Sequence, residues 1–206
     1  METPRQALLP VHSWEEAQAA AAAALRKADA PVVISLRTPA TTLRAAARAQ
    51  ARAAVRELLG TLLDRAPEAV PLVTTPGQPP RLDLPGTPLG LSLSHDSGIT
   101  LAALYPGGAT GVDVMRIDAL PDWEMLALDY LGPAERDAIA ALPAGRRDHA
   151  FAQAWTRMEA CIKCLGIGLR EWTPELQRLL ARCSVRQLAL NEGLSGAVAW
   201  VAGQPA

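Results

Sequence analysis

The chain has 206 residues, of which 50% are apolar and 4% aromatic, and its formal net charge is −1. This length allows one large domain or two small ones with a real core, and the small net charge argues against a generic nucleic-acid binder, which would carry a basic excess. The chain contains three cysteines, no signal-peptide pattern and no uninterrupted apolar run of about 18 residues. We therefore expect a soluble, reduced, cytoplasmic protein without a membrane partner.

The first part of the chain alternates helical and strand-like patterns. Ser13 is a good N-cap for a helix that runs to about Lys27, and a strand-like stretch follows at 32–36. A second helix is predicted from Thr41 or Thr42 to Leu59, with Gly60 as a possible end. Arginines recur along it every four residues, which places them on one face: Arg44, Arg48, Arg52 and Arg56. This row is either a solvated helix face or a site for a polyanion.

A segment rich in proline and glycine, residues 66–90, is predicted to form loops and turns. Two strand patterns follow, at 89–94 and 99–105, and Gly98 between them predicts a hairpin. A third strand is predicted at 110–114.

The second part of the chain begins with helical patterns and ends in strands. The helices are predicted at 121–131, 133–142 and 147–164, and the strands at 184–190 and 197–201. Short strands joined by tight turns favour antiparallel pairing. We expect an α+β protein with two similar lobes, 1–108 and 109–206, each a small, mainly antiparallel sheet packed with helices.

Two strand-borne motifs carry candidate functional groups. Ser94-His95 stands at a strand end beside a glycine turn and can present a hydroxyl and an imidazole to a phosphate, although a lone histidine is more often structural. Asp113 lies between Val112 and Val114, so its side chain should face away from theirs, into a cleft. A buried carboxylate there requires a cation or hydrogen-bond donors.

The long predicted helix carries a third motif. Glu159 and Lys163 are i,i+4 partners on one face, and Trp155 stands one turn before them. Glu135 lies in the first turn of another helix, where an acidic residue is usual. The C-x-x-C formed by residues 161–164 lies within a helix and lacks a second pair, so these cysteines are expected to pack in the core rather than to bind zinc.

In this order the motifs resemble those of the 4′-phosphopantetheinyl transferase superfamily, of the surfactin-synthetase-activating type. The residues that carry the resemblance are Ser94-His95, Gly111-Val-Asp113-Val, Glu135, Trp155-Thr-Arg-Met-Glu159-Ala-Cys-Ile-Lys163 and Gly166-Ile-Gly168-Leu169. The resemblance covers residues 75–172, and before this stretch only the layout is similar.

The resemblance implies a monomeric, two-lobed enzyme that moves the phosphopantetheine arm of coenzyme A to a serine of an acyl- or peptidyl-carrier protein. Such carriers serve fatty-acid, polyketide or nonribosomal-peptide synthesis. Asp113 and Glu159 would hold Mg²⁺, Lys163 would contact the pyrophosphate, and Glu135 would be the base for the serine. The coenzyme A site would comprise Ser94, His95, Arg44, Arg48 and Gln78.

Three positions depart from the family pattern. Met115 stands where a second metal carboxylate is usual, Met158 where a lysine is usual, and Gln78 where many members have a lysine that binds coenzyme A. A thioether is a poor Mg²⁺ ligand, although a water could replace the missing carboxylate. The sequence therefore leaves two functions open: an active transferase, or a non-catalytic relative that binds coenzyme A or a carrier protein.

Overall fold

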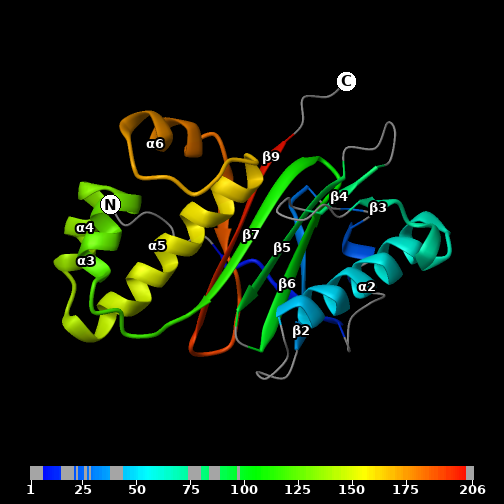
Figure 1. The fold of residues 1–206 in the computed structure, drawn as a ribbon, viewed down its shortest axis with the longest axis horizontal. Helices are drawn as coiled ribbons and strands as arrows, with labels where there is room; N and C mark the ends of the chain where they lie inside the picture. The colour runs from blue at the N-terminus through cyan, green and yellow to red at the C-terminus, as the bar shows by residue number, and fades with distance from the viewer. Residues whose placement is uncertain are drawn as a thin grey trace.

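Figure 1 shows the computed structural model of the chain, with the strands in the middle and α2 and α5 on opposite sides of them. It describes residues 7–14, 21, 23–25, 27, 29–37, 44–73, 80–83, 89–96 and 98–202. Much of the helix predicted after Ser13 lies outside these ranges. None of the helices described has the length and apolar character needed to cross a bilayer.

The first sheet has the strand order β1-β2-β6-β5. β1 pairs with β2 in parallel, whereas the β2–β6 and β5–β6 pairs are antiparallel. The predicted hairpin is therefore present as β5 and β6. The bounds are β1 Val11–Ser13, β2 Val32–Arg37, β5 Gly90–Asp96 and β6 Ile99–Tyr105.

The second sheet has the order β7-β9-β8 and is antiparallel throughout. A separate antiparallel pair, β3 with β4, lies in the segment predicted as loops. The bounds are β3 Leu72–Val73, β4 Arg81–Leu82, β7 Gly108–Arg116, β8 Ser184–Gln187 and β9 Leu194–Ala202.

Helices flank the two sheets. Proline occupies the first helical position of α4, as predicted from the sequence. The segment predicted as one helix at 121–131 is a short α-helix, α3, that continues into a π-helical turn, η2. The bounds are α2 Arg44–Leu63, η1 Pro67–Ala69, α3 Trp123–Leu126, η2 Ala127–Leu131, α4 Pro133–Ala140, α5 Ala144–Cys164 and α6 Pro174–Leu180.

Strand alternation explains how these layers stack. In β2 and β6, Ile34 and Leu104 pack against α2, while Val33 and Leu101 pack on the second sheet. The far face of the second sheet packs against α5. The order of layers is therefore α2, first sheet, second sheet, α5.

One hydrophobic cluster crosses the boundary predicted between the two lobes. It joins Val33 and Leu101 to Val112, Val114 and further buried residues of the second sheet. Leu9 adds a β-bridge to Leu188. The structure is α+β, as the sequence indicates, but its two sheets share a core.

Two further differences from the sequence prediction concern α2 and α6. α2 does not end at Gly60 but continues to Leu63. The chain then turns back over that glycine, where a Cβ would lie 2.7 Å from the carbonyl oxygen of Arg65. α6 was not predicted, although it has a local signal. The side chain of Thr173 accepts a hydrogen bond from the Leu176 amide, and Pro174 is the first helical residue.

Candidate active site

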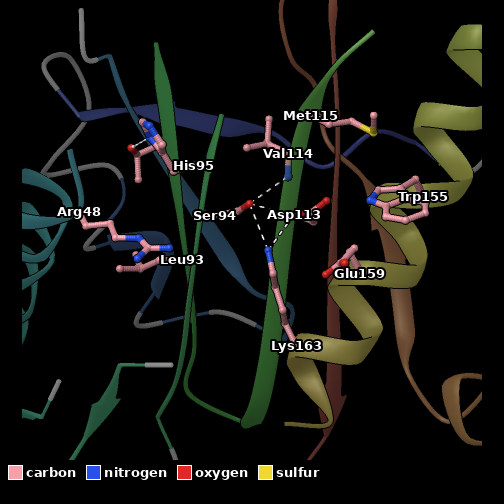
Figure 2. Close-up of a pocket in the computed structure, with 11 residues that line it drawn as sticks. Arg48, Leu93, Ser94, His95, Asp113, Val114, Met115, Trp155, Glu159 and Lys163 are labelled. Atoms are coloured by element: carbon pink, nitrogen blue, oxygen red, sulfur yellow. Dashed lines mark hydrogen bonds and ion pairs between the residues drawn. The ribbon is translucent and has the colours of Figure 1, made fainter. Parts of the chain in front are cut away.

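A cleft of about 390 Å³ lies between β5, β7, α2 and α5, and Figure 2 shows its lining. It brings together groups that are far apart in the sequence. The lining residues are Arg48, Leu93, Ser94, His95, Thr100, Asp113, Val114, Met115, Trp155, Glu159 and Lys163.

Asp113 reaches the cleft because of its place in β7. The neighbouring valines point into the shared core, so Asp113 faces α5, as the alternation predicts. Gly111, on the same face, allows α5 to come close: a Cβ there would lie 2.1 Å from the carbonyl oxygen of Ala160. The Gly-Val-Asp-Val motif therefore combines helix–strand contact with a cleft-facing carboxylate.

The face of α5 towards the cleft carries Trp155, Glu159 and Lys163, one turn apart, as their spacing predicts. Trp155 stacks on Phe151, with ring centroids 5.7 Å apart, and meets the edge of Tyr130 at 5.6 Å. These contacts fix the indole as one wall of the cleft.

Lys163 and Asp113 form an ion pair at the centre of the cleft. The ammonium Nζ lies 2.7 Å from Asp113 Oδ1, and the side chains are 31% and 11% exposed. Nζ also donates to the Val112 carbonyl oxygen and to Ser94 Oγ, each at 3.2 Å. All three ammonium protons are therefore engaged.

Glu159 has an unusual electrostatic environment. Burial raises the pKa of its carboxyl above the ordinary value of 4.5, and the charge of Asp113 raises it further, while Lys163 acts in the opposite direction. The negative charge of Asp113 disfavours ionisation of Glu159, so the two carboxylates repel each other in the cleft. A cation placed between the two acids would relieve this repulsion.

The donor set fits Mg²⁺ or a similar hard cation. Asp113 and Glu159 supply carboxylate oxygens to one cleft, and Mg²⁺ ordinarily keeps several waters and substrate phosphates beside one or two carboxylates. Among the residues described, no group of three or more acidic, histidine or cysteine side chains is arranged to hold a metal. A bound cation would therefore rely on these two acids, water and substrate.

The methionine departures have different structural consequences. Met115 lines the cleft but also packs against a hydrophobic cluster formed by η2, α4 and α5. Met158 is 7% exposed and does not line the cleft. The apolar residue at 158 therefore fills buried space, and only the one at 115 alters the cleft wall.

The cleft also holds cationic and imidazole groups near β5. Arg48, from the arginine row on α2, and His95 both line the cleft, and His95 Nδ1 is 2.8 Å from Thr100 Oγ1. Arg56, in the same row, donates instead to the Leu72 carbonyl oxygen. Within the arginine row, Arg48 therefore lines the cleft, whereas Arg56 makes a structural contact. Gln78 and the Arg44 side chain lie outside the described residues.

Glu135, the expected base, is not brought to the cleft. Its carboxylate accepts a hydrogen bond from Arg157 at 2.9 Å, and both side chains are more than 40% exposed. Arg157 is two residues from Glu159 on α5, which turns it about 200° away. The position of Glu135 outside the cleft could not be predicted from the sequence. Glu135 lies on α4, and no local pattern relates that helix to the elements that line the cleft.

Comparison with known proteins finds one family that matches part of the chain. Residues 109–195 match the 4′-phosphopantetheinyl transferase superfamily. This part of the chain is similar to that superfamily. The matched stretch contains the transferase-type motifs around Asp113, Glu159 and Lys163, and it ends before the last residues of β9.

Three curated relatives of the superfamily show the extent of the similarity. AcpT of Salmonella typhi, named a 4′-phosphopantetheinyl transferase, is 38% identical over 39% of this chain and 42% of its own length. HetI of a Nostoc species, also named a 4′-phosphopantetheinyl transferase, is 30% identical over 38% of this chain and 33% of its own length. The slr0495 protein of Synechocystis, named for the same activity, is 29% identical over 57% of this chain and 48% of its own length. The matches span about half the length of these relatives or less.

Proposed function

We propose that the protein transfers the 4′-phosphopantetheine arm of coenzyme A to a serine of an acyl- or peptidyl-carrier protein, with Mg²⁺. The observation that carries this proposal is the meeting of Asp113, Glu159 and Lys163 in one cleft with Arg48 and His95. Phosphoryl-type transfer depends on positioning and on neutralising phosphate charge, and these groups supply both.

Each group has a role in this proposal. Asp113 and Glu159 hold Mg²⁺, which when bound neutralises charge on the pyrophosphate. Lys163 exchanges one of its present acceptors for a pyrophosphate oxygen. Arg48 and His95 bind the 3′-phosphate of coenzyme A.

The base for the carrier serine in this proposal is Glu135, directly or through a water, as the sequence pattern implies. Glu135 would have to leave Arg157 to act. Glu159 is assigned to the cation, so its carboxylate is engaged there.

The two-part cleft favours the surfactin-synthetase-activating type. Arg48 and His95 come from the predicted lobe 1–108, and Asp113, Glu159 and Lys163 from the lobe 109–206 of the same chain. A single chain therefore supplies every group invoked, which supports a monomer with coenzyme A between two lobes. A cytoplasmic location, where coenzyme A and carriers are available, belongs to the same proposal.

The decisive experiment incubates the protein with coenzyme A, Mg²⁺ and a panel of apo carrier proteins, and follows the mass of each carrier. We expect a mass gain equal to the phosphopantetheine arm. Asp113→Asn and Glu159→Gln should each reduce the rate by about 100-fold or more. Glu175→Gln, at an exposed glutamate that pairs with Arg178 outside the cleft lining, is the matched control and should keep the wild-type rate. If the folded wild-type protein modifies none of the carriers, the proposal is wrong.

A second experiment tests the 3′-phosphate subsite. Dephospho-coenzyme A lacks that phosphate, so wild-type protein should prefer coenzyme A. Arg48→Ala should raise the KM for coenzyme A and reduce this preference, because one phosphate cation is lost, while dephospho-coenzyme A should react at an almost unchanged rate. Arg52→Ala, one turn away and outside the cleft lining, is the control. Equal losses with both substrates would contradict the assignment of Arg48.

A further inference from the structure

Ser94 makes more contacts in the cleft than its place in a Ser-His pair suggests. Its hydroxyl donates to Asp113 Oδ1 at 2.9 Å and accepts from the Val114 amide at 3.3 Å. It also accepts from Lys163 Nζ at 3.2 Å. The side chain therefore joins β5 to both β7 and α5, as Figure 2 shows.

These three hydrogen bonds use the full hydrogen-bonding capacity of the Ser94 hydroxyl. A serine side chain has one proton to donate and two lone pairs to accept with. Ser94 uses the proton on Asp113 and both lone pairs on nitrogen donors. To donate to a phosphate oxygen it would first have to release Asp113, and the residue is only 8% exposed.

Strand alternation also separates Ser94 from His95. Leu91 and Leu93 point towards the α2 side of β5, so Ser94 points the opposite way, towards β7. His95 returns to the side of Arg48. The two residues of the Ser-His motif thus serve different parts of the cleft.

Ser94 is the middle rung of a seam between the two sheets. The amides of Val112 and Arg116 on β7 donate to Ser92 Oγ and Asp96 Oδ2 on β5, at 3.1 and 2.6 Å. Each of the three hydrogen bonds joins residues 20 positions apart in the sequence. In each, a β7 amide donates to a β5 side chain, so these bonds take the place of backbone–backbone hydrogen bonds between the two strands. Ser92 does not line the cleft, so Ser94 is the seam serine that also contacts the ion pair.

We propose that Ser94 is a positioning residue for the metal carboxylate rather than a ligand of the 3′-phosphate. It holds Asp113 by Oδ1, together with Lys163, and so directs Oδ2 to the cation. Among the described residues, no hydrogen bond reaches Oδ2. This inference rests on the proposed function, in which Asp113 and Glu159 hold Mg²⁺.

The test compares Ser94→Ala with Ser92→Ala. Both remove one seam hydroxyl, but only the first frees the Asp113 carboxylate. Binding of Mn²⁺, as a paramagnetic substitute for Mg²⁺, is measured by electron paramagnetic resonance without substrate. We expect Ser94→Ala to weaken Mn²⁺ binding by about 10- to 100-fold, as is typical when a partner of a metal ligand is lost. Ser92→Ala should bind Mn²⁺ like the wild type, and Ser94→Thr, which keeps the hydroxyl, should restore binding.

Kinetics separate the two roles of Ser94. A positioning role predicts that Ser94→Ala raises the Mg²⁺ concentration needed for half-maximal rate and lowers kcat, with little change in the KM for coenzyme A. A phosphate ligand would instead raise that KM and leave Mn²⁺ binding unchanged, which would overturn the inference. Equal effects of Ser92→Ala and Ser94→Ala on Mn²⁺ binding would also overturn it, because the seam alone would then matter. Wild-type protein that binds Mn²⁺ at this site but modifies no carrier would refute the proposed function and leave the role of Ser94 standing.

Discussion

At the scale of single residues, the cleft brings together charged side chains whose burial costs folding free energy. Two carboxyl groups, on Asp113 and Glu159, approach one ammonium, on Lys163, and the environment raises the pKa of Glu159. Such shifts are common at functional sites, because a catalytic group and a stable fold have different requirements. The consequence for stability follows from the direction of the shift.

Glu159→Gln should stabilise the protein at neutral pH. A carboxyl with a raised folded pKa holds its proton more tightly in the folded state, so the wild type loses stability as pH rises from about 4.5 through the folded pKa. The neutral amide does not have this loss. Melting temperatures measured between pH 4 and 8 should therefore converge at low pH and diverge at high pH, with the variant higher.

Mg²⁺ should reverse that order. A ligand at 100 times its Kd stabilises a folded protein by about 2.7 kcal/mol. The wild type should gain this increment when Mg²⁺ is added at pH 8, and Glu159→Gln should gain much less. A variant that melts below the wild type at every pH without metal would contradict the electrostatic account of Glu159.

At the scale of elements, α5 and β7 form the framework of the site. Their close approach depends on Gly111, and it sets the position of Asp113 relative to Lys163. The end of α5 also packs Cys161 and Cys164 against the second sheet, where Cys183 joins them. All three are free thiols, and the sequence prediction of a packing role for the C-x-x-C agrees with their burial.

Gly111→Ala should destabilise the protein and impair the site together. Its Cβ would meet the Ala160 carbonyl oxygen at 2.1 Å and the Cys164 amide nitrogen at 2.4 Å, both of them backbone atoms. Overpacking of this kind costs about 1–3 kcal/mol. Urea denaturation should show that loss, and Mn²⁺ binding should weaken. Gly168→Ala, whose Cβ meets nothing within 4 Å, is the control and should do neither.

Cys183 should be the most reactive thiol of the three. Cys183 is the least buried of the three, and its contacts with Cys161 and then Cys164 lower its pKa, while contact with Cys183 and burial raise the pKa of both partners. Nucleophilic attack requires the thiolate. Brief treatment with iodoacetamide at pH 6.5, followed by peptide mass spectrometry, should find the label on residue 183 first. Replacing both partners with alanine should slow that labelling, and earlier labelling of Cys161 would contradict this reasoning.

At the scale of the whole molecule, the two parts of the chain depend on each other. The cleft draws groups from both sides of the predicted boundary at 108/109, and a hydrophobic cluster and a seam of hydrogen bonds cross it. The proposed binding of coenzyme A between the two parts would need them held in a fixed relative position, and the shared core would do this.

Fragments 1–108 and 109–206 should therefore not fold when produced separately. Each would expose apolar residues such as Val33 or Val112, which are fully buried in the intact chain. Circular dichroism and thermal melting should show no cooperative transition for either fragment alone. A cooperative melt of one fragment would mean that its lobe is an independent domain.

The features that could be predicted from the sequence are those that follow a local period. Alternation in Val112-Asp113-Val114 places the carboxylate opposite the core, and four-residue spacing places Glu159 and Lys163 on one helix face, because backbone geometry sets both periods. These patterns, in order, also carried the resemblance to the transferase superfamily.

Which of these groups meet depends on how the layers pack. Lys163 bonds to Asp113 and Ser94 across 50 and 69 positions of sequence, and such contacts depend on how layers pack rather than on any local period. Packing also sends Glu135 to Arg157 and buries Met158. The sequence therefore fixes the chemical groups and their local directions, while the packing of α5 on β7 and of β5 beside it decides their partners.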